Sequence, residues 1–560
     1  MSILDTNLQA MKLGFPELYV RVINAFEKKI EPDFLEIIKH ETTTETGTIY
    51  VTTKEKKRIR LNSAYDPRYE AEIWFQGQEN TEASILFIMG IGNGSFAKTV
   101  VEERAGRSQI LVYEPSAQLF LYALQNFDLT FLFCTPGVRV ICEKLNADMY
   151  LGVMELMLTM DNCEDAAFFT VPQFKTLFPN SLKKFLGGYM DGVGRLMANF
   201  NTLRKFIHLL PYNQLHNLRY LEKNTVVPRL AKVWDPETPI LLIGAGPSLQ
   251  EEVEVLREAG EKSFLFAVDS ALPFLMSVDI IPDAFISIEP DQDMEYFEDE
   301  RIKDIPMFCR LTTTYSVLDR QKAPIIFGYD ESFGQKIYEN YGVPISHYRY
   351  GGNGATSLFA ISKELGAKNI IMVGQDMSYG RDGKSHVGDR DDGYTAEKRF
   401  IYESNTGEKV QSRQDWHRFA LWYENAIPVC KFEHVVNTAA HGLKVNGTEY
   451  MPLNEALVKY GRKHEKFSNI LSQTKETFEK NSGFSLQNFY KRCWNEHMEL
   501  HEMLAADPED ENRKKYLLYE LLSMYEMAAY KEDWHQGQKE GMDKLEQYLK
   551  QCMMCEKENE

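Results

Sequence analysis

Short runs of consecutive apolar residues recur along the chain, and each breaks off into glycine or acidic residues. Residues 85–89 read ILFIM, residues 240–243 read ILLI, and residues 369–373 end in IIMV. Apolar runs of this length, bounded by turn residues, predict strands that are buried on both faces of a sheet. Helical patterns follow the first two runs, at 96–104 and 249–259. Strands that alternate with helices predict an α/β fold with mostly parallel sheets.

The same order of elements occurs twice. Each unit has a strand, a glycine turn, a helix and a second strand that ends in an acidic residue. The spacing from the last glycine of the turn to this acid is similar, Gly94 to Glu114 and Gly246 to Asp269. This order is typical of a Rossmann-type βαβ unit. The chain is therefore expected to contain two Rossmann-like domains in tandem.

The rest of the pattern completes the predicted organisation. Further strands are expected at 109–113, 264–268, 284–288, 324–327 and 434–436, and further helices at 182–204 and 355–365. After Pro452 the strand signals vanish, and 463–560 has an amphipathic, charged, helical pattern. We predict an N-terminal Rossmann-like domain with a helical extension at 1–205, a central catalytic domain at 206–455 and a helical domain at 456–560.

Composition narrows the class of protein. The formal net charge of −19 argues against a nucleic-acid partner, since phosphates need a basic face. Eight cysteines in 560 residues suit a reducing compartment. The first residues show no basic start before an apolar stretch, and no apolar run is long enough to span a bilayer. We expect a cytoplasmic protein without a membrane span.

The turn after residues 240–243 is the first candidate for chemistry. Gly244 and Gly246 allow close backbone approach and positive φ. Pro247 favours a helix start, and Ser248 with Glu251 matches a capping box. A helix N-terminus favours an anion. The segment is neither a GxGxxG turn nor a Walker motif, so a nicotinamide site and a Walker ATP site fit poorly.

Two further segments carry polar groups at predicted strand ends or helix starts. In GGNGATS, backbone amides near Gly354 and the hydroxyls of Thr356 and Ser357 can hold a phosphate or a carboxylate. Asp376 lies just past residues 369–373, where doubly wound sheets place ligands. Downstream of it, a tyrosine can donate to a leaving phosphate and a histidine can act as a base, at Tyr379 and His386.

Two other groups of residues have a structural explanation as well as a functional one. Glu289 and Asp291 follow a predicted strand, where they can bind a sugar hydroxyl or a metal, or lie in a solvated loop. Arg349 can pair with a carboxylate, although surface exposure is the commoner fate of an arginine. The pair His497 and His501 is expected to be a helix face, because no third ligand is evident.

Several motifs in one order resemble a known family. GAGPSL, AVDSALPFL, IPDAFISIEP, GGNGATS, VGQDMSYGRDGKSHVGD and VVNTAAHGLKVNG look like the motility-associated factor (Maf) flagellin glycosyltransferases. The resemblance is strong over 206–455, and the GIGNG turn and the helical C-terminus fit the family. It implies transfer of a nonulosonic acid, of pseudaminic or legionaminic type, from its CMP-activated form to Ser or Thr of flagellin.

The central region resembles, more distantly, bacterial sialyltransferases with a GNGPSL motif, in which Ala245 here replaces an asparagine. That resemblance implies that Thr356 and Ser357 hold the sugar carboxylate and that Tyr379 stabilises the leaving phosphate. The base is either His386 or His417, with Asp376 as a further catalytic residue. The implied nucleotide-sugar site comprises Gly244, Ala245, Gly246, Pro247, Ser248, Asp269, Ser270, Glu289, Gly354, Thr356, Ser357 and Gln375.

A CMP leaving group requires neither a metal nor another cofactor, so none is expected. The first alternative is a pterin diphosphokinase-like enzyme that uses ATP and Mg²⁺ held by Glu289 and Asp291. The second is a methyltransferase that binds S-adenosylmethionine at the N-terminal glycine turn and Glu114. The third is a flagellin-binding protein without activity.

Overall fold

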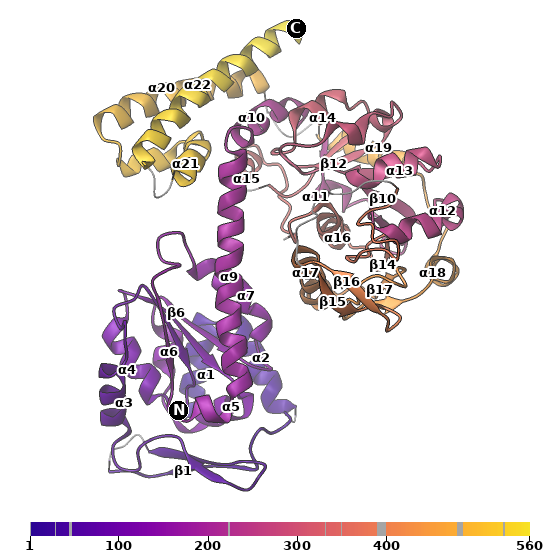
Figure 1. Ribbon diagram of the computed structural model, residues 1–560. Coiled ribbons are helices and arrows are strands. Elements are labelled where there is room, and N and C mark those ends of the chain that lie inside the picture. Colours follow the sequence, from indigo (N-terminus) through magenta and orange to yellow (C-terminus); the bar gives the residue numbers. More distant parts are fainter. Residues whose placement is uncertain are drawn as a thin grey trace. The chain divides into compact units, whose positions relative to one another are not determined.

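The computed structural model describes residues 2–28, 30–43, 47–221, 224–330, 332–348, 350–388, 399–478, 485–529 and 533–559. The chain forms two compact units, Met1–Asn201 and Thr202–Glu560, each with its own hydrophobic core. Figure 1 shows their elements. The division into three domains stays a prediction.

Unit 1 contains two sheets. The first is antiparallel, with β1 (Glu36–His40), β2 (Thr48–Thr52) and β3 (Arg58–Arg60) in that order. The second is parallel, in the order β6-β5-β4-β7, with β4 (Ile85–Met89), β5 (Gln109–Glu114), β6 (Val138–Cys142) and β7 (Ala166–Thr170). The positions of β4 and β5 agree with the predicted strands, whereas β6 and β7 were not predicted.

Helices of unit 1 surround the parallel sheet and supply part of its core. Phe96 of α4 and Phe120 of α5 are fully buried. The long helix α9 continues past residue 201. The helices are α1 (Ile3–Gly14), α2 (Pro16–Glu27), α3 (Pro67–Gln76), α4 (Ser95–Arg104), α5 (Ala117–Asn126), α6 (Thr130–Cys134), α7 (Tyr150–Met157), α8 (Phe174–Leu177) and α9 (Pro179–Phe206).

Unit 2 is built on one large parallel sheet. Its order is β18-β17-β14-β9-β10-β11-β12-β13-β8. The strands are β8 (Thr225–Val226), β9 (Ile240–Ile243), β10 (Phe264–Val268), β11 (Ala284–Ile286), β12 (Met307–Cys309), β13 (Ile325–Phe327), β14 (Asn369–Val373), β17 (His434–Asn437) and β18 (Glu449–Tyr450). A separate antiparallel hairpin consists of β15 (Phe400–Glu403) and β16 (Lys409–Ser412).

The strand order creates a switch point between β9 and β14. From β9 the chain adds β10 to β13 on one side, and it then returns to place β14 on the other side of β9. Ligands of open α/β sheets bind at the carboxyl ends of the strands at such a point. The two polar turns that follow β9 and β14 are therefore neighbours.

The helices of unit 2 complete the fold. They are α10 (Leu210–Leu221), α11 (Val227–Leu230), α12 (Val253–Ala259), α13 (Leu272–Ser277), α14 (Tyr315–Arg320), α15 (Ser332–Asn340), α16 (Gly354–Glu364), α17 (Gln414–Cys430), α18 (Leu453–Tyr460), α19 (Phe467–Phe478), α20 (Leu486–Ala506), α21 (Tyr519–Ala528) and α22 (Trp534–Asn559). The predicted helical C-terminus is confirmed. His497 packs inside it, with Nε2 3.0 Å from the Met542 carbonyl oxygen.

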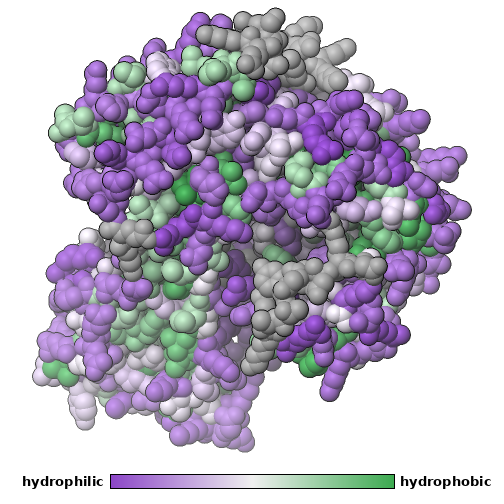
Figure 2. Space-filling view, turned by 45° about the horizontal axis from the view of Figure 1, so that its top comes forward, coloured by the Kyte–Doolittle hydropathy of each residue, from purple (hydrophilic) through white to green (hydrophobic). Residues whose placement is uncertain are grey.

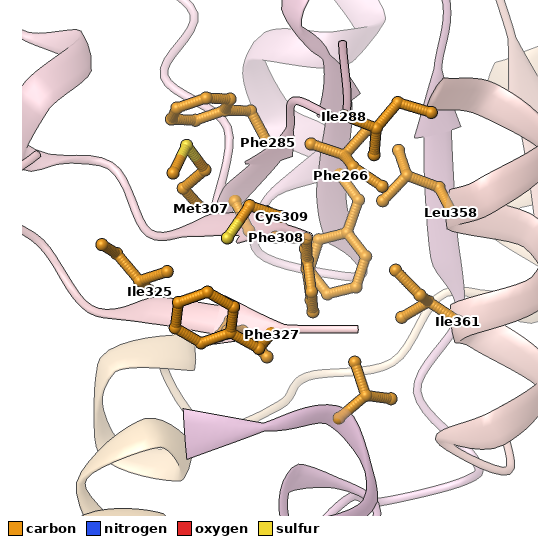
Figure 3. Close-up of a cluster of buried hydrophobic side chains, with 14 of the residues drawn as sticks. Phe266, Phe285, Ile288, Met307, Phe308, Cys309, Ile325, Phe327, Leu358 and Ile361 are labelled. Carbon is orange, nitrogen blue, oxygen red and sulfur yellow. The ribbon is translucent and has the colours of Figure 1, made fainter. Parts of the chain in front are cut away.

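An aromatic core fixes α16 against the sheet (Figure 3). The ring centroids of Phe266 and Phe308 lie 5.2 Å apart, edge to face. Leu358 and Ile361 project from α16 toward these rings and are almost fully buried. Burying side chains of this size stabilises a fold by roughly 1.5–3 kcal/mol each. This packing holds the start of α16 at the carboxyl edge of the sheet.

Hydrophilic residues cover most of the face that Figure 2 shows. Among the described residues, no helix has the length and apolarity needed to cross a bilayer. The α/β fold with two tandem Rossmann-like sheets and helices after them is confirmed.

Candidate functional site

Two turns at the switch point bind each other through their backbones. The Gly244 N–H donates to the Val373 carbonyl at 2.8 Å, and the Gly246 N–H donates to the Gly374 carbonyl at 2.7 Å. A Cβ added to Gly244 would lie 2.6 Å from the Gly374 oxygen, and one on Gly246 would lie 2.1 Å from Asp376 Oδ2. The expected close backbone approach is therefore present, and only glycine fits at both positions.

The expectation of positive φ was wrong for this turn. Gly246 has φ −69°, and the left-handed conformation belongs to Gly374, at φ 62°. The expected capping box of Ser248 and Glu251 was also wrong, because Pro247–Glu252 is a 3-10 helix without a side-chain cap. α12 begins only at Val253. The physical reason is that Ser248 bonds across to the neighbouring strand end.

Asp376 is the partner of that serine. The Ser248 hydroxyl donates to Asp376 Oδ2 at 2.8 Å, and its N–H lies 3.2 Å from Oδ1. Burial raises the pKa of Asp376 to about 6, and the bonds from Ser248 oppose the shift. Through these hydrogen bonds Asp376, which follows β14, holds the turn after β9 in place. Sequence reasoning found both residues but not the bond between them.

The side-chain amide of Gln375 makes hydrogen bonds within the protein at both of its ends. Its Nε2 donates to the Leu242 carbonyl at 2.9 Å, and the Tyr423 hydroxyl donates to its Oε1 at 2.7 Å. Both ends of the amide thereby join β14 to β9 and α17. In this structure Gln375 is a positioning residue, and its suggested contact with a nucleotide sugar stays a prediction.

The segment 378–388 folds over the turn after β9. The Val387 N–H donates to the Ala245 carbonyl at 2.9 Å, and a Cβ on Gly380 would lie 3.0 Å from Pro247 Cβ. Two of the expected catalytic residues, Tyr379 and His386, therefore lie in the segment that adjoins this turn. Loops over a rigid sheet edge commonly carry functional groups.

Trp416 of α17 connects those two side chains. Its ring centroid lies 4.9 Å from Tyr379 and 6.4 Å from His386. His386 Nδ1 lies 3.0 Å from the Ser385 hydroxyl. The Arg399 guanidinium stacks 3.9 Å from the centroid of the Tyr379 ring. This places a phenol, an imidazole and a cation in one neighbourhood.

His417 lies on the same helix but has a different environment. Its ring stacks on Tyr402 of β15, with centroids 4.5 Å apart and planes at 23°. Its neighbour Trp416 is the residue that packs on Tyr379 and His386. The structure thus brings His386 to the turn after β9 and places His417 against the β15–β16 hairpin.

Two acidic residues follow the strands on the other side of β9. Burial raises the pKa of Asp269, after β10, to about 7, despite a bond from the Ser270 N–H at 2.8 Å. Its neighbour in space, Glu289 after β11, adds to that shift through its negative charge. Desolvation also raises the pKa of Glu289 itself, against the opposing charge of Arg310.

The start of α16 lies over these acids. A Cβ on Gly354 would lie 3.3 Å from Ile286 and 3.4 Å from Val268, which end β11 and β10. Asn353 caps the helix by accepting from the Thr356 N–H at 2.8 Å. The hydroxyl groups of Thr356 and Ser357 both donate to the Asn353 carbonyl at 2.9 Å. These hydroxyls therefore organise the loop, and direct contact with a ligand stays a prediction.

Sequence reasoning missed the polar group after β12. The Arg310 guanidinium lies 4.8 Å from the centroid of the Tyr350 ring and contacts the Tyr350 hydroxyl. The strand that precedes Arg310 is only three residues long and was not predicted. The candidate Arg349 lies outside the described residues. Among those that are described, no group of three His, Cys, Asp or Glu side chains is arranged to hold a metal.

Comparison with known proteins gives three findings. Residues 212–382 match the family described as 6-hydroxymethylpterin diphosphokinase MptE-like. An uncharacterized protein of Treponema pallidum (strain Nichols) is 33% identical over 117 residues, which are 21% of this chain and 54% of that protein. The chain thus matches about half the length of this relative.

The third finding is a solved structure, the Maf glycosyltransferase from Magnetospirillum magneticum AMB-1. It superposes with a TM-score of 0.51 at 12% identity, over 99% of this chain and 95% of that chain. At this identity the likeness concerns the fold. The resemblance seen in the sequence motifs is therefore confirmed as a shared fold: the chain has the fold of a Maf glycosyltransferase over nearly its whole length.

Proposed function

We propose that the protein is a glycosyltransferase that moves a nonulosonic acid from its CMP-activated form to Ser or Thr of flagellin. The observation that carries the proposal is the pairing of the two turns at the switch point, where Gly246 bonds to Gly374 and Ser248 bonds to Asp376. The shared fold with the Maf glycosyltransferase supports the same assignment. We further propose that the reaction takes place in the cytoplasm.

The site offers separate places for the parts of the donor. The carboxyl edge of β9 lies at the switch point, where the nucleotide is proposed to bind. The backbone amides that begin α16 are proposed to face the sugar carboxylate or the phosphate, since a helix start favours anions. Asp269 and Glu289 can accept bonds from hydroxyl groups of the donor.

The chemistry follows from these positions. His386 takes the proton of the acceptor hydroxyl, whose oxygen attacks the anomeric carbon of the sugar. The bond from that carbon to the phosphate oxygen breaks, and CMP leaves with the electron pair. The Tyr379 hydroxyl donates to the phosphate as its charge develops. No step of this scheme requires a metal or another cofactor.

Kinetic measurements on variants of His386 and His417 test which of the two is the catalytic base. His386→Ala is expected to lower kcat by roughly 10²–10⁴-fold, the usual worth of a positioned base. His417→Ala is expected to change kcat by less than about tenfold, since its ring stacks on Tyr402. The measurement is CMP release from the donor with flagellin present. The opposite order of effects would move the base to α17.

Ligand binding tests the site without an acceptor. CMP is expected to raise the Tm of the full chain, because a ligand that binds only the native state stabilises it. The shift should disappear in Gly246→Val and shrink in Ser248→Ala, which keeps the backbone turn. Gly260→Val is the control, as its Cβ position has only Leu265 near it, at 3.8 Å. If CMP did not raise the Tm of the wild-type protein, the proposal would be contradicted.

The match over 212–382 supports a second candidate, an ATP-dependent diphosphokinase of the MptE-like kind. Such an enzyme would use the same turn for ATP and the acids Glu289 and Asp291 for Mg²⁺. The same thermal experiment separates the two. Stabilisation by ATP with Mg²⁺ and not by CMP, with ATP consumed in the presence of a pterin, would establish this alternative instead.

A further inference from the structure

The glycine turn of unit 1 lies at a switch point of its own. In the order β6-β5-β4-β7, the chain passes from β4 to β5 and β6 and returns to place β7 on the other side of β4. The turn after β4 contains Gly90, Gly92 and Gly94, with φ of 103°, 55° and 89°. These conformations favour glycine. Glu114 ends the neighbouring strand, as an acid does in sheets that bind a ribose.

Three segments that precede β4 cover this edge; we call them the cover, and they are residues 33–34, Gly47 and Asn62. The Asn93 amide donates to the Gly47 carbonyl at 2.9 Å, and the Ser116 hydroxyl donates to Asp33 at 2.6 Å. The Gln118 side-chain oxygen accepts from the N–H groups of both residues 33–34. Hydrogen bonds thus join the cover to the turn and to the end of β5, and the buried Phe34 ring packs on Phe178, with the ring centroids 5.8 Å apart.

Two buried polar groups at the turn have no partner. Asn62 is 2% exposed, and neither its amide nitrogen nor its oxygen makes a hydrogen bond. Its Oδ1 lies 3.6 Å from the Cβ position of Gly92. The Ser95 hydroxyl, at the start of α4, is also buried without a bond. Each such group costs about 1–3 kcal/mol, so the closed turn lacks partners that a bound molecule would supply.

Glu114 has acceptor capacity left. It is fully buried, and its two oxygens accept from the N–H groups of Ile91 at 2.7 Å and Ser116 at 3.1 Å. A carboxylate accepts about four hydrogen bonds. The Gly92 N–H is a third backbone donor to this group, so one ribose hydroxyl can bond to Glu114 without displacing the backbone donors.

We propose that unit 1 binds a ribonucleoside-bearing ligand at this turn when the cover opens. The 2′-hydroxyl of the ribose bonds to Glu114, and the side-chain amide of Asn62 bonds to one donor and one acceptor of the ligand. The polar group that the nucleoside carries lies near Ser95 and the start of α4. Adenine nucleotides and S-adenosylmethionine share this chemistry. The proposal is independent of the sugar-transfer site in unit 2.

The test measures the Tm of the full chain with AMP, S-adenosylmethionine and 2′-deoxy-AMP. It is made in the Gly246→Val background as well as in the native sequence, so that binding in unit 2 is separated. At a hundredfold excess over Kd, the true ligand should raise Tm by roughly 5–10 °C. The 2′-deoxy compound, which lacks one ribose hydroxyl, should bind at least tenfold more weakly.

Asn62→Leu makes the test sharper. It removes the unpaired amide from the closed turn, so the Tm without ligand should stay the same or rise, while the ligand shift disappears. Asn7→Leu is the matched control, because Asn7 is a buried asparagine of unit 1 with its bonds made, to Leu124, Phe127 and Leu129. It should lower Tm and keep the ligand shift.

Three results would overturn the proposal. The first is a native chain that responds to neither ribonucleoside ligand. The second is equal binding of AMP and 2′-deoxy-AMP, which would exclude the ribose contact with Glu114. The third is an Asn62→Leu variant as destabilised as Asn7→Leu, which would mean that the Asn62 amide is satisfied in the closed protein.

Discussion

At the scale of single residues, the two central turns show that glycine serves different physical needs. Gly246 is required because any Cβ would lie 2.1 Å from Asp376 Oδ2, although its φ suits every residue. Gly374 opposite it has φ 62° and also has the Gly244 carbonyl 2.6 Å from its Cβ position. The sequence indicates that glycines are needed, and only the contacts reveal why.

Gly246→Val is therefore expected to destabilise unit 2 beyond its effect on binding. The added side chain must push apart the ends of β9 and β14, and overpacking of this kind costs typically about 1–3 kcal/mol. Urea unfolding monitored by circular dichroism measures the loss. Gly260→Val should change the free energy of unfolding by less than about 1 kcal/mol, since nothing crowds that position. Equal losses in both variants would contradict the steric argument.

Glu114 predicts a pH dependence of stability. Burial raises its pKa from 4.5 to about 8 in the folded protein. The folded state then binds the proton more tightly than the unfolded chain, so this contribution is fully present below pH 4.5 and is lost as the pH rises through about 8. Its size is on the order of 3–5 kcal/mol.

Glu114→Gln should accordingly flatten the fall in unfolding free energy between pH 5 and 8. Denaturant unfolding at several pH values measures it. Glu254→Gln, whose side chain is 88% exposed, is the control and should follow the native profile. A Glu114→Gln profile as steep as the native one would show that other carboxyl groups, such as those of Asp269 and Asp376, dominate the titration.

At the scale of elements, α16 connects the core to the site. Its apolar face packs on Phe266 and the neighbouring strands, and its start is organised by Asn353. The helix was predicted from its pattern within a residue of its bounds, because its apolar positions and glycine-rich start are both local signals. The network in which Gly351 donates to Thr356 at 3.0 Å was not predictable, because it depends on how the loop folds back.

Asn353→Ala tests this cap. Loss of a side-chain cap costs typically about 0.5–2 kcal/mol, and the start of α16 should fray. Asn353→Asp should recover most of the stability, since a carboxylate also caps well. Urea unfolding gives the stability, and the CMP thermal shift reports on the site. If Asn353→Ala retained both full stability and the full CMP shift, the cap would not organise the loop.

At the scale of the whole molecule, the net negative charge of the chain repels the proposed donor substrate. The chain carries a net charge of −19, and a CMP-activated nonulosonic acid is itself anionic. The acids Asp269 and Glu289 lie at the proposed site. Long-range repulsion between such partners slows association, and salt screens it over a Debye length of about 8–10 Å.

The KM for the donor is therefore expected to fall by roughly two- to threefold when the ionic strength rises from about 10 to 150 mM. Initial rates of CMP release at several salt concentrations measure it. Sodium and potassium chloride should act alike if screening is the cause. A KM that rises with salt would show instead that local cations, such as Arg310, dominate binding.

The sequence alone determined the parts of this protein that rest on local patterns. Buried strands such as β4, β9 and β14 were predicted at their bounds, because both faces of a parallel strand are covered and its residues are uniformly apolar. The very short strands β8, β12 and β18 were not predicted, because two or three residues carry too little pattern. The polar turns were also found, since glycine and acidic residues interrupt apolar runs.

Only the tertiary structure decided how those turns are used. It paired Ser248 with Asp376, engaged Thr356 and Ser357 in a cap, and set His386 rather than His417 beside the turn after β9. It also left the side-chain amide of Asn62 buried without a hydrogen bond beside the other glycine turn. These contacts join residues far apart in the sequence. Strand order and side-chain packing create them, and neither is encoded in a local pattern.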